Sequence, residues 1–248
     1  MSRHRPGRLA CFLLALWVAG SRVTQAAIAF VQDDVGHNSA TTSLAVAFTS
    51  NVTAGNAIVL LLKTVSTVTI SSIVDTLGHT YVLAQENDAQ SMRTGLYRVV
   101  NISGGANTVT ITVSASSSVT AVVLEYSGMA TSGELDQSNF NSGASATSGN
   151  HGSITTTVGD GIIISVMGFG GNPGTITGTS GWTARQVANV RQYPQDKITS
   201  ATETTSGAIT WATAQTWNGV IANFAAAGGA PAAPKRLMLL GVGDRARP

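Results

Sequence analysis

Short apolar runs separated by tight turns recur along this chain, and they constrain its fold more than any other feature. The segment 107–113 (NTVTITV) alternates polar and branched apolar residues, the period-two pattern of a strand with one buried face. The segments 57–62 (AIVLLL) and 161–167 (GIIISVM) are continuous apolar runs preceded by Gly-Asn or Gly-Asp, which favours buried strands. No apolar set keeps helical spacing over three turns, and the most helix-like segment, 84–92, is polar and is expected to be a loop or a single turn. The sequence therefore predicts an all-β protein.

The strand pattern occurs twice. Three pairs of matching segments follow one another in the same order: VTAGN at 52–56 and TTVGD at 156–160, GHT at 78–80 and GWT at 181–183, and VLEY at 123–126 and IANF at 221–224. Offsets that drift slowly in one order indicate an internal repeat rather than chance matches. We place the repeats at 28–127 and 133–226.

Two repeats of this kind predict a two-sheet antiparallel β-sandwich of jelly-roll or immunoglobulin-like type. Each repeat could form a free-standing sandwich, or both could contribute to one. The junction at 127–134 (SGMATSGE) is short and contains no proline. We therefore favour one integrated β-sandwich region over residues 27–226.

The chain begins with the layout of a secretory signal peptide at residues 1–26. Basic residues precede an apolar run at 9–20, and small residues follow it near a cleavage point. Twelve apolar residues are too few for a membrane-spanning helix, which needs about 20. The single cysteine, Cys11, lies within the apolar run, so the processed chain would contain no thiol. We expect a secreted or cell-surface protein without a stable membrane span after cleavage.

The charge distribution argues against a nucleic-acid partner. Residues 27–226 contain six basic and eleven acidic residues, so this region has no basic footprint for nucleic acid or anionic lipid. Residues 227–248 read as a glycine- and proline-containing linker followed by a basic tail.

Several of these segments resemble a known type of protein. The segments are FVQ at 30–32, TAGN at 53–56, ISSIVDTLGHTY at 70–81, LYRVVNISGGANTVTITV at 96–113 and VLEYSG at 123–128. Together they resemble uncharacterised bacterial secreted proteins with a duplicated TAGN…GxTY…EYSG pattern. The resemblance covers about residues 28–226 and implies a β-sandwich and export. It transfers no catalytic motif.

The sequence gives little support for a catalytic nucleophile or for histidine metal ligands. The chain has no G-x-S-x-G nucleophile motif, so its serines are interpreted as turn and surface residues. His37, His79 and His151 lack the close spacing of metal ligands, and each adjoins glycine or asparagine. We expect solvated loop histidines.

The most metal-like cluster is the segment Asp33-Asp34-x-Gly36-x-Asn38. Calcium binds carboxylate and carbonyl oxygens from a turning loop, so Asp33, Asp34 and Asn38 are candidate Ca²⁺ ligands. The alternative interpretation is a polar turn at a strand end.

Two further features bear on ligands and catalysis. Trp182 and Tyr193, in segments flanked by glycine or proline, are expected in exposed loops where aromatic faces can stack on sugar rings. Glu125, in the apolar run 119–126, is expected on the solvent face, and the second repeat has Asn223 in its place.

The sequence thus favours a non-catalytic extracellular binding or adhesion module, with a glycan or other surface polymer as partner. One alternative is a structural component of an envelope, appendage or virion that assembles with copies of itself. The other is a carbohydrate-active enzyme that uses a pair of carboxylates about 5–10 Å apart.

Overall fold

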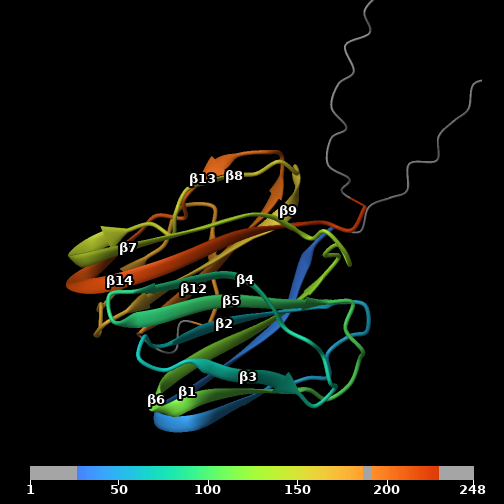
Figure 1. Ribbon diagram of the computed structural model, residues 1–248. Coiled ribbons are helices and arrows are strands. Elements are labelled where there is room, and N and C mark those ends of the chain that lie inside the picture. Colours follow the sequence, from blue (N-terminus) through green and yellow to red (C-terminus); the bar gives the residue numbers. More distant parts are fainter. Residues whose placement is uncertain (1–26, 187–190, 229–248) are drawn as a thin grey trace, which may run out of the picture.

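The computed structural model describes residues 27–186 and 191–228, which form strands joined by turns and loops (Figure 1). The first repeat contains β1 (Ala29–Ala47), β2 (Ala57–Val65), β3 (Ile70–Asp75), β4 (Val82–Ala89), β5 (Met92–Val100) and β6 (Thr108–Ser127). The second contains β7 (Leu135–Gly149), β8 (Ile154–Thr155), β9 (Asp160–Phe169), β10 (Ile176–Thr177), β11 (Thr183–Ala184), β12 (Gln192–Ser200), β13 (Thr204–Thr205) and β14 (Ile209–Ala225). The all-β prediction is confirmed. The expected signal peptide at 1–26 and nearly all of the tail lie outside the described residues.

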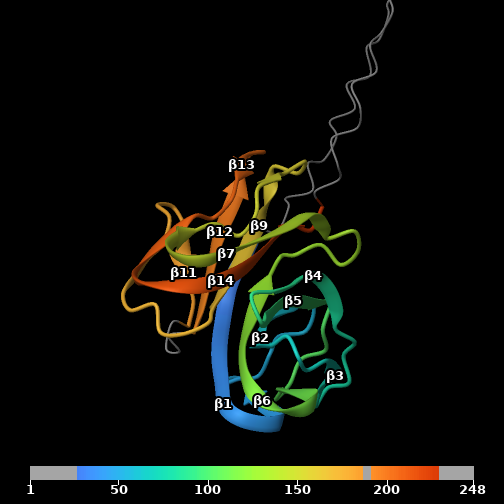
Figure 2. The same cartoon turned by 60° about the vertical axis from the view of Figure 1, so that its left-hand side comes forward.

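Each repeat forms its own six-stranded antiparallel sheet, and the two sheets share one topology. The first has the order β1-β6-β2-β5-β4, with β3 also paired to β6. In the second, β7 and β10 pair with β14, and β9, β12 and β11 follow. Strands β1, β2, β3, β4, β5 and β6 therefore correspond to β7, β9, β10, β11, β12 and β14. Figures 1 and 2 show the two sheets stacked, which confirms a β-sandwich built from two similar halves.

The long strand β6 folds the first sheet around a core of its own. One edge of β6 pairs with β1 along its length, whereas the other edge pairs with β3 at Val109–Val113 and with β2 at Thr120–Tyr126. Side chains from both halves of the strand, such as Ile111 and Val123, belong to one buried cluster. The sheet thus curls round this cluster.

A second core joins the two repeats. Val59 and Leu61 of β2 lie in one buried cluster with Ile164 of β9 and with Val220 and Phe224 of β14. The alternate residues of β2, such as Leu60, face the core inside the first repeat instead. Strand β2 is therefore buried on both faces, which explains why its sequence is continuously apolar rather than alternating.

Polar side chains also bridge the repeats. The hydroxyl of Tyr126 in β6 donates to Asp196 Oδ2 in β12 at 2.6 Å, and Arg185 Nε donates to the same oxygen at 2.7 Å. Burial, and then the charge of Asp196, raise the pKa of the Tyr126 hydroxyl well above its usual value. Elsewhere in the interface, Thr94 Oγ1 donates to Asn218 Oδ1 at 2.5 Å. The Tyr126–Asp196 and Thr94–Asn218 bonds are buried and join the two repeats, so they help to fix the position of one sheet against the other.

One secondary-structure prediction is wrong. Residues 84–92, expected as a loop or a single turn, include most of strand β4 and the hairpin turn to β5. Strand β4 lies at the sheet edge and is only partly buried, so its polar side chains are tolerated there. Within the described residues, no helix is long and apolar enough to span a bilayer.

Candidate functional site

Three connections meet at one end of the first repeat, and we call this surface the loop end. It comprises residues 48–56 between β1 and β2, 76–81 between β3 and β4, and 101–107 between β5 and β6. Val52 and Gly105 exchange two backbone hydrogen bonds of 2.9 and 3.0 Å, and Gly55 N–H donates to the carbonyl of Ile102 at 2.8 Å. The connections 48–56 and 101–107 are thereby fastened to each other through their backbones.

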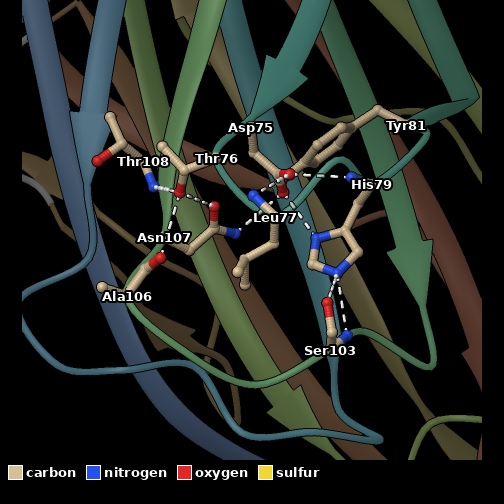
Figure 3. Close-up of polar contacts among 9 residues, drawn as sticks. All are labelled: Asp75, Thr76, Leu77, His79, Tyr81, Ser103, Ala106, Asn107 and Thr108. Atoms are coloured by element: carbon tan, nitrogen blue, oxygen red, sulfur yellow. Dashed lines mark hydrogen bonds and ion pairs between the residues drawn. The ribbon is translucent and has the colours of Figure 1, made fainter.

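Asp75, the last residue of β3, organises the middle of the loop end (Figure 3). Its Oδ1 accepts from the backbone N–H groups of Leu77, at 3.2 Å, and His79, at 2.9 Å. Its Oδ2 accepts from His79 Nδ1 at 2.8 Å, Asn107 Nδ2 at 2.9 Å and the Tyr81 hydroxyl at 3.0 Å. Gly78 completes the turn with a φ of 76°, in the left-handed region that glycine adopts freely.

These five donors keep the buried carboxyl ionised. Burial alone would raise the pKa of Asp75, but hydrogen bonds from Asn107, His79 and Tyr81 outweigh it and hold this pKa below its usual value. Burial, and then the charge of Asp75, raise the pKa of the Tyr81 hydroxyl far above its usual range. The site therefore holds a fixed negative charge beneath its surface.

His79 extends the network to the third connection. Because a carboxylate only accepts hydrogen bonds, the proton between Asp75 and His79 belongs to Nδ1 of the ring. On the other side of the ring, Nε2 lies 2.9 Å from Ser103 Oγ and accepts from the backbone N–H of Ser103, also at 2.9 Å. Ser103 is exposed, the His79 side chain is 10% exposed and that of Asp75 is fully buried.

This serine–histidine–aspartate order is that of acyl-transfer enzymes, yet one contact opposes such chemistry. A general base needs the Nε2 lone pair for the serine hydroxyl, and here the backbone N–H of Ser103 competes for it at the same distance. The arrangement instead clamps 101–107 to 76–81. The sequence-based expectation that His79 is a solvated loop residue is wrong, because the Asp75 carboxylate and Ser103 hold its ring in place.

Among the residues of the second repeat that the structure describes, none forms an equivalent of this network. Ile176 and Thr177 of β10 pair with Trp211 and Thr210, as Ile73 and Val74 of β3 pair with Ile111 and Thr110. By the match of 78–80 with 181–183, Gly178 takes the place of Asp75. By the sequence match, Trp182 takes the place of His79.

The two aromatic residues predicted to bind sugars are not both exposed. Tyr193 lies in strand β12 rather than in a loop, is 6% exposed, and belongs to a core cluster with Phe169 and Trp211. Trp182 is half-buried and packs against a small cluster that includes Ile163. The expectation of two exposed loop aromatics is wrong for Tyr193 and only partly met by Trp182. Pro194 favoured a loop in the sequence, but it lies in β12, next to the residues of β12 that pair with the two-residue strand β11.

The predicted calcium ligands lie in strand β1 rather than in a turning loop. Asp34 accepts from Thr49 N–H at 2.7 Å, Asp33 accepts from Gln186 Nε2 at 2.8 Å, and Asn38 accepts from Ala40 N–H at 3.0 Å. Neighbouring strand residues point to opposite faces, so the turn that the prediction required is wrong. Within 27–186 and 191–228, no three His, Cys, Asp or Glu side chains gather as a metal site would need.

Glu125 is fully buried, so its predicted position on the solvent face is wrong. It accepts from Gln32 Nε2 at 2.6 Å, from Asn56 Nδ2 at 2.6 Å and from Thr53 N–H at 2.8 Å. The connection 48–56 folds over this end of β6 and supplies two of these donors. Glu125 therefore anchors the loop end from beneath.

The second repeat performs the same anchoring with the charge on another strand. Asp136 Oδ2 in β7 accepts from Thr157 N–H at 2.8 Å and from Asn223 Nδ2 at 2.9 Å. Thr157 and Asn223 match Thr53 and Glu125 of the first repeat. In the first repeat the carboxylate lies on β6, whereas in the second it lies on β7, the counterpart of β1. In both repeats it holds the connection that precedes the buried strand. Glu125 is thus a structural residue.

The remaining histidines differ from each other. His37 is exposed in β1, with Nδ1 3.0 Å from Thr120 Oγ1. His151 is fully buried, and its Nδ1 lies 2.7 Å from the carbonyl oxygen of Gly207. The prediction of a solvated histidine is therefore wrong for His151, and His37 is exposed but lies in a strand.

Comparison with models of known protein families gives no match, and neither do searches of curated proteins and of solved structures. The function is therefore argued from the geometry of the chain itself.

Proposed function

We propose that this protein is a non-catalytic binding module of the cell exterior, and that the loop end of the first repeat binds a neutral, hydroxyl-rich ligand of glycan type. One observation carries the proposal: the Asp75 carboxylate fixes the connections 76–81 and 101–107 through five hydrogen bonds. A surface that is already ordered loses little conformational entropy on binding, which favours affinity.

The composition of the loop end supports a neutral ligand. The three connections, 48–56, 76–81 and 101–107, contain no Lys, Arg, Asp or Glu. Their exposed residues include Thr53, Thr80, Asn101 and Ser103, whose hydroxyl and amide groups can both donate and accept hydrogen bonds. Such groups suit sugar hydroxyls better than they suit a charged partner.

The expected export signal at residues 1–26 supports the location. A secreted or surface-attached module would meet polysaccharides and other surface polymers, so the partner and the location agree. Aromatic stacking, which the sequence suggested through Trp182 and Tyr193, has a smaller part in this proposal because Tyr193 is buried.

A glycan array with the full chain tests the proposal. Ser103→Ala and Thr80→Ala remove exposed hydroxyls from the loop end, and we expect each to weaken binding of any captured glycan at least fivefold. The matched control is Ser180→Ala, on the corresponding turn of the second repeat, where Ser180 is exposed. Absence of any glycan signal, or equal binding by the three variants, would refute the proposal.

A second candidate function, self-assembly, is favoured by one feature. Strand β1 has 19 residues and lies at the edge of its sheet, and β6 is its only partner among the described strands. Such an edge is a template for pairing with another copy of the chain. Three register irregularities in the β1–β6 ladder oppose this, because bulges blunt an edge. Sedimentation velocity over a hundredfold concentration range would show oligomers if self-assembly were the function.

A further inference from the structure

A second site lies at the far end of strand β2 from the loop end. A cavity of about 420 Å³ opens between the repeats, and both contribute to its lining. Lys63 and Ser118 come from the first repeat, whereas Gly170, Arg191 and Thr216 come from the second. Because β2 begins at Ala57, next to the loop end, Lys63 is about 20 Å further along the strand, at roughly 3.3 Å per residue.

Lys63 is the unusual member of this lining. The residue is 4% exposed, and burial, together with the nearby charge of Arg191, lowers the pKa of Lys63 to about 8. Other basic residues form ion pairs with carboxylates: Arg93, Arg98, Arg185 and Lys197. Among residues 27–186 and 191–228, no carboxylate pairs with Lys63. The intervening segment 187–190 (VANV) contains no acidic residue.

A buried ammonium group without a carboxylate partner is energetically unfavourable, and a bound anion would relieve that cost. Arg191 lies on the same cavity and adds a second positive charge. We propose that this cavity binds an oxyanion group, carboxylate or sulfate, carried by a molecule of about the size of one sugar. The volume falls in the range of small-molecule sites, and Ser118 and Thr216 offer hydroxyls beside the charges.

The cavity rim carries a further sign of specialisation. Gln90 and Ser91 form the two-residue turn between β4 and β5, and both have a φ of 57°. Both residues line the cavity. Hairpin turns of this kind favour asparagine and glycine, so two other residues in the left-handed region strain the backbone here. Strain of this kind clusters at ligand sites.

Calorimetric titration of the full chain tests the proposal with glucuronate and glucose 6-sulfate as probes and glucose as the neutral control. We expect both anionic probes to bind and glucose not to bind. Lys63→Met keeps an unbranched chain of similar length without the charge, and it should weaken both anions at least tenfold. Lys197→Met, which removes a lysine paired with Glu203, should change affinity less than twofold.

Three outcomes would overturn the inference: no anion binding by the natural chain, equal affinity in Lys63→Met, or equal binding of glucose. Inorganic sulfate that binds as tightly as the two sugars would overturn the assignment of a sugar-sized ligand. If Lys63→Met does not fold, Lys63→Gln replaces it. Ser103→Ala should leave anion binding unchanged, so failure of the loop-end proposal and failure of this one can be told apart.

Discussion

His151 makes the stability of the second repeat depend on pH. The side chain is fully buried, its Nδ1 donates to the Gly207 carbonyl, and its Nε2 has no hydrogen-bond partner among the described residues. Burial lowers the pKa of His151 to about 4, although its hydrogen bonds partly oppose this shift. Histidine in an unfolded chain has a pKa of about 6.5. The folded protein therefore holds this ring neutral over a range in which the unfolded chain is protonated.

The size of the effect follows from the two pKa values. Above about pH 6.5 the ring is neutral in both states, and burial of the neutral form contributes its full stability. As the pH falls, the unfolded state binds the proton first, so the free energy of unfolding decreases until the folded ring also titrates near pH 4. The whole window is worth about 3 kcal/mol, and about 2 kcal/mol of it is lost by pH 5.

Urea denaturation of the natural chain and of His151→Gln, each at pH 8 and pH 5, measures this effect. At pH 8 the difference between the chains reports lost packing and hydrogen bonding, which we expect to be about 1–2 kcal/mol. At pH 5 only the natural chain has lost about 2 kcal/mol to the titrating ring, so the difference should fall to about zero or reverse its sign. The same difference at both pH values would show that His151 does not titrate as described.

Three further perturbations give expected outcomes. Asp75→Asn should lower the free energy of unfolding by about 3 kcal/mol at pH 7, because the amide turns an NH₂ group toward donors such as Asn107. Since the folded pKa of Asp75 is depressed, this difference should persist above about pH 4 and shrink in more acidic urea titrations. Between pH 8 and 10.4 only the unfolded lysine is charged, so the free energy of unfolding of the natural chain should rise by about 3 kcal/mol at most. Lys63→Met should abolish this rise, and an unchanged rise would contradict the buried cation. Phe224→Ala should cost about 3–5 kcal/mol in thermal or urea unfolding, whereas Phe140→Ala, at 52% exposure, should stay within about 0.5 kcal/mol; equal losses would contradict the core between the repeats.

The strands were predictable where burial dictates the sequence. The runs at 57–62 and 161–167 fall within β2 and β9, because strands buried on both faces must be apolar throughout. Strand β4 was missed at 84–92 because burial dictates little of its sequence. Strand β4 lies at an edge, where hydrogen bonding to β5 fixes the backbone but little burial constrains the side chains.

The candidate site was largely invisible in the sequence. Asp75 and His79 are four residues apart, and the turn at Gly78 could have suggested that they meet. Ser103 lies 24 residues beyond His79, and its contact depends on the pairing of β3 and β6. The alternation around Glu125 predicted its strand, but not the connection that covers it. Position on a strand is encoded locally, whereas coverage by a distant loop is not.

The core shared by the repeats has a consequence for how the protein is made. A ribosome releases the first repeat about one hundred residues ahead of the second. Until β9 and β14 have been synthesised, the apolar face of β2 that carries Val59 and Leu61 lacks the strands that bury it in the folded protein. The nascent chain therefore passes through a partly folded state with exposed apolar surface, which is prone to aggregate. A chaperone that binds this surface would raise the yield of folded protein.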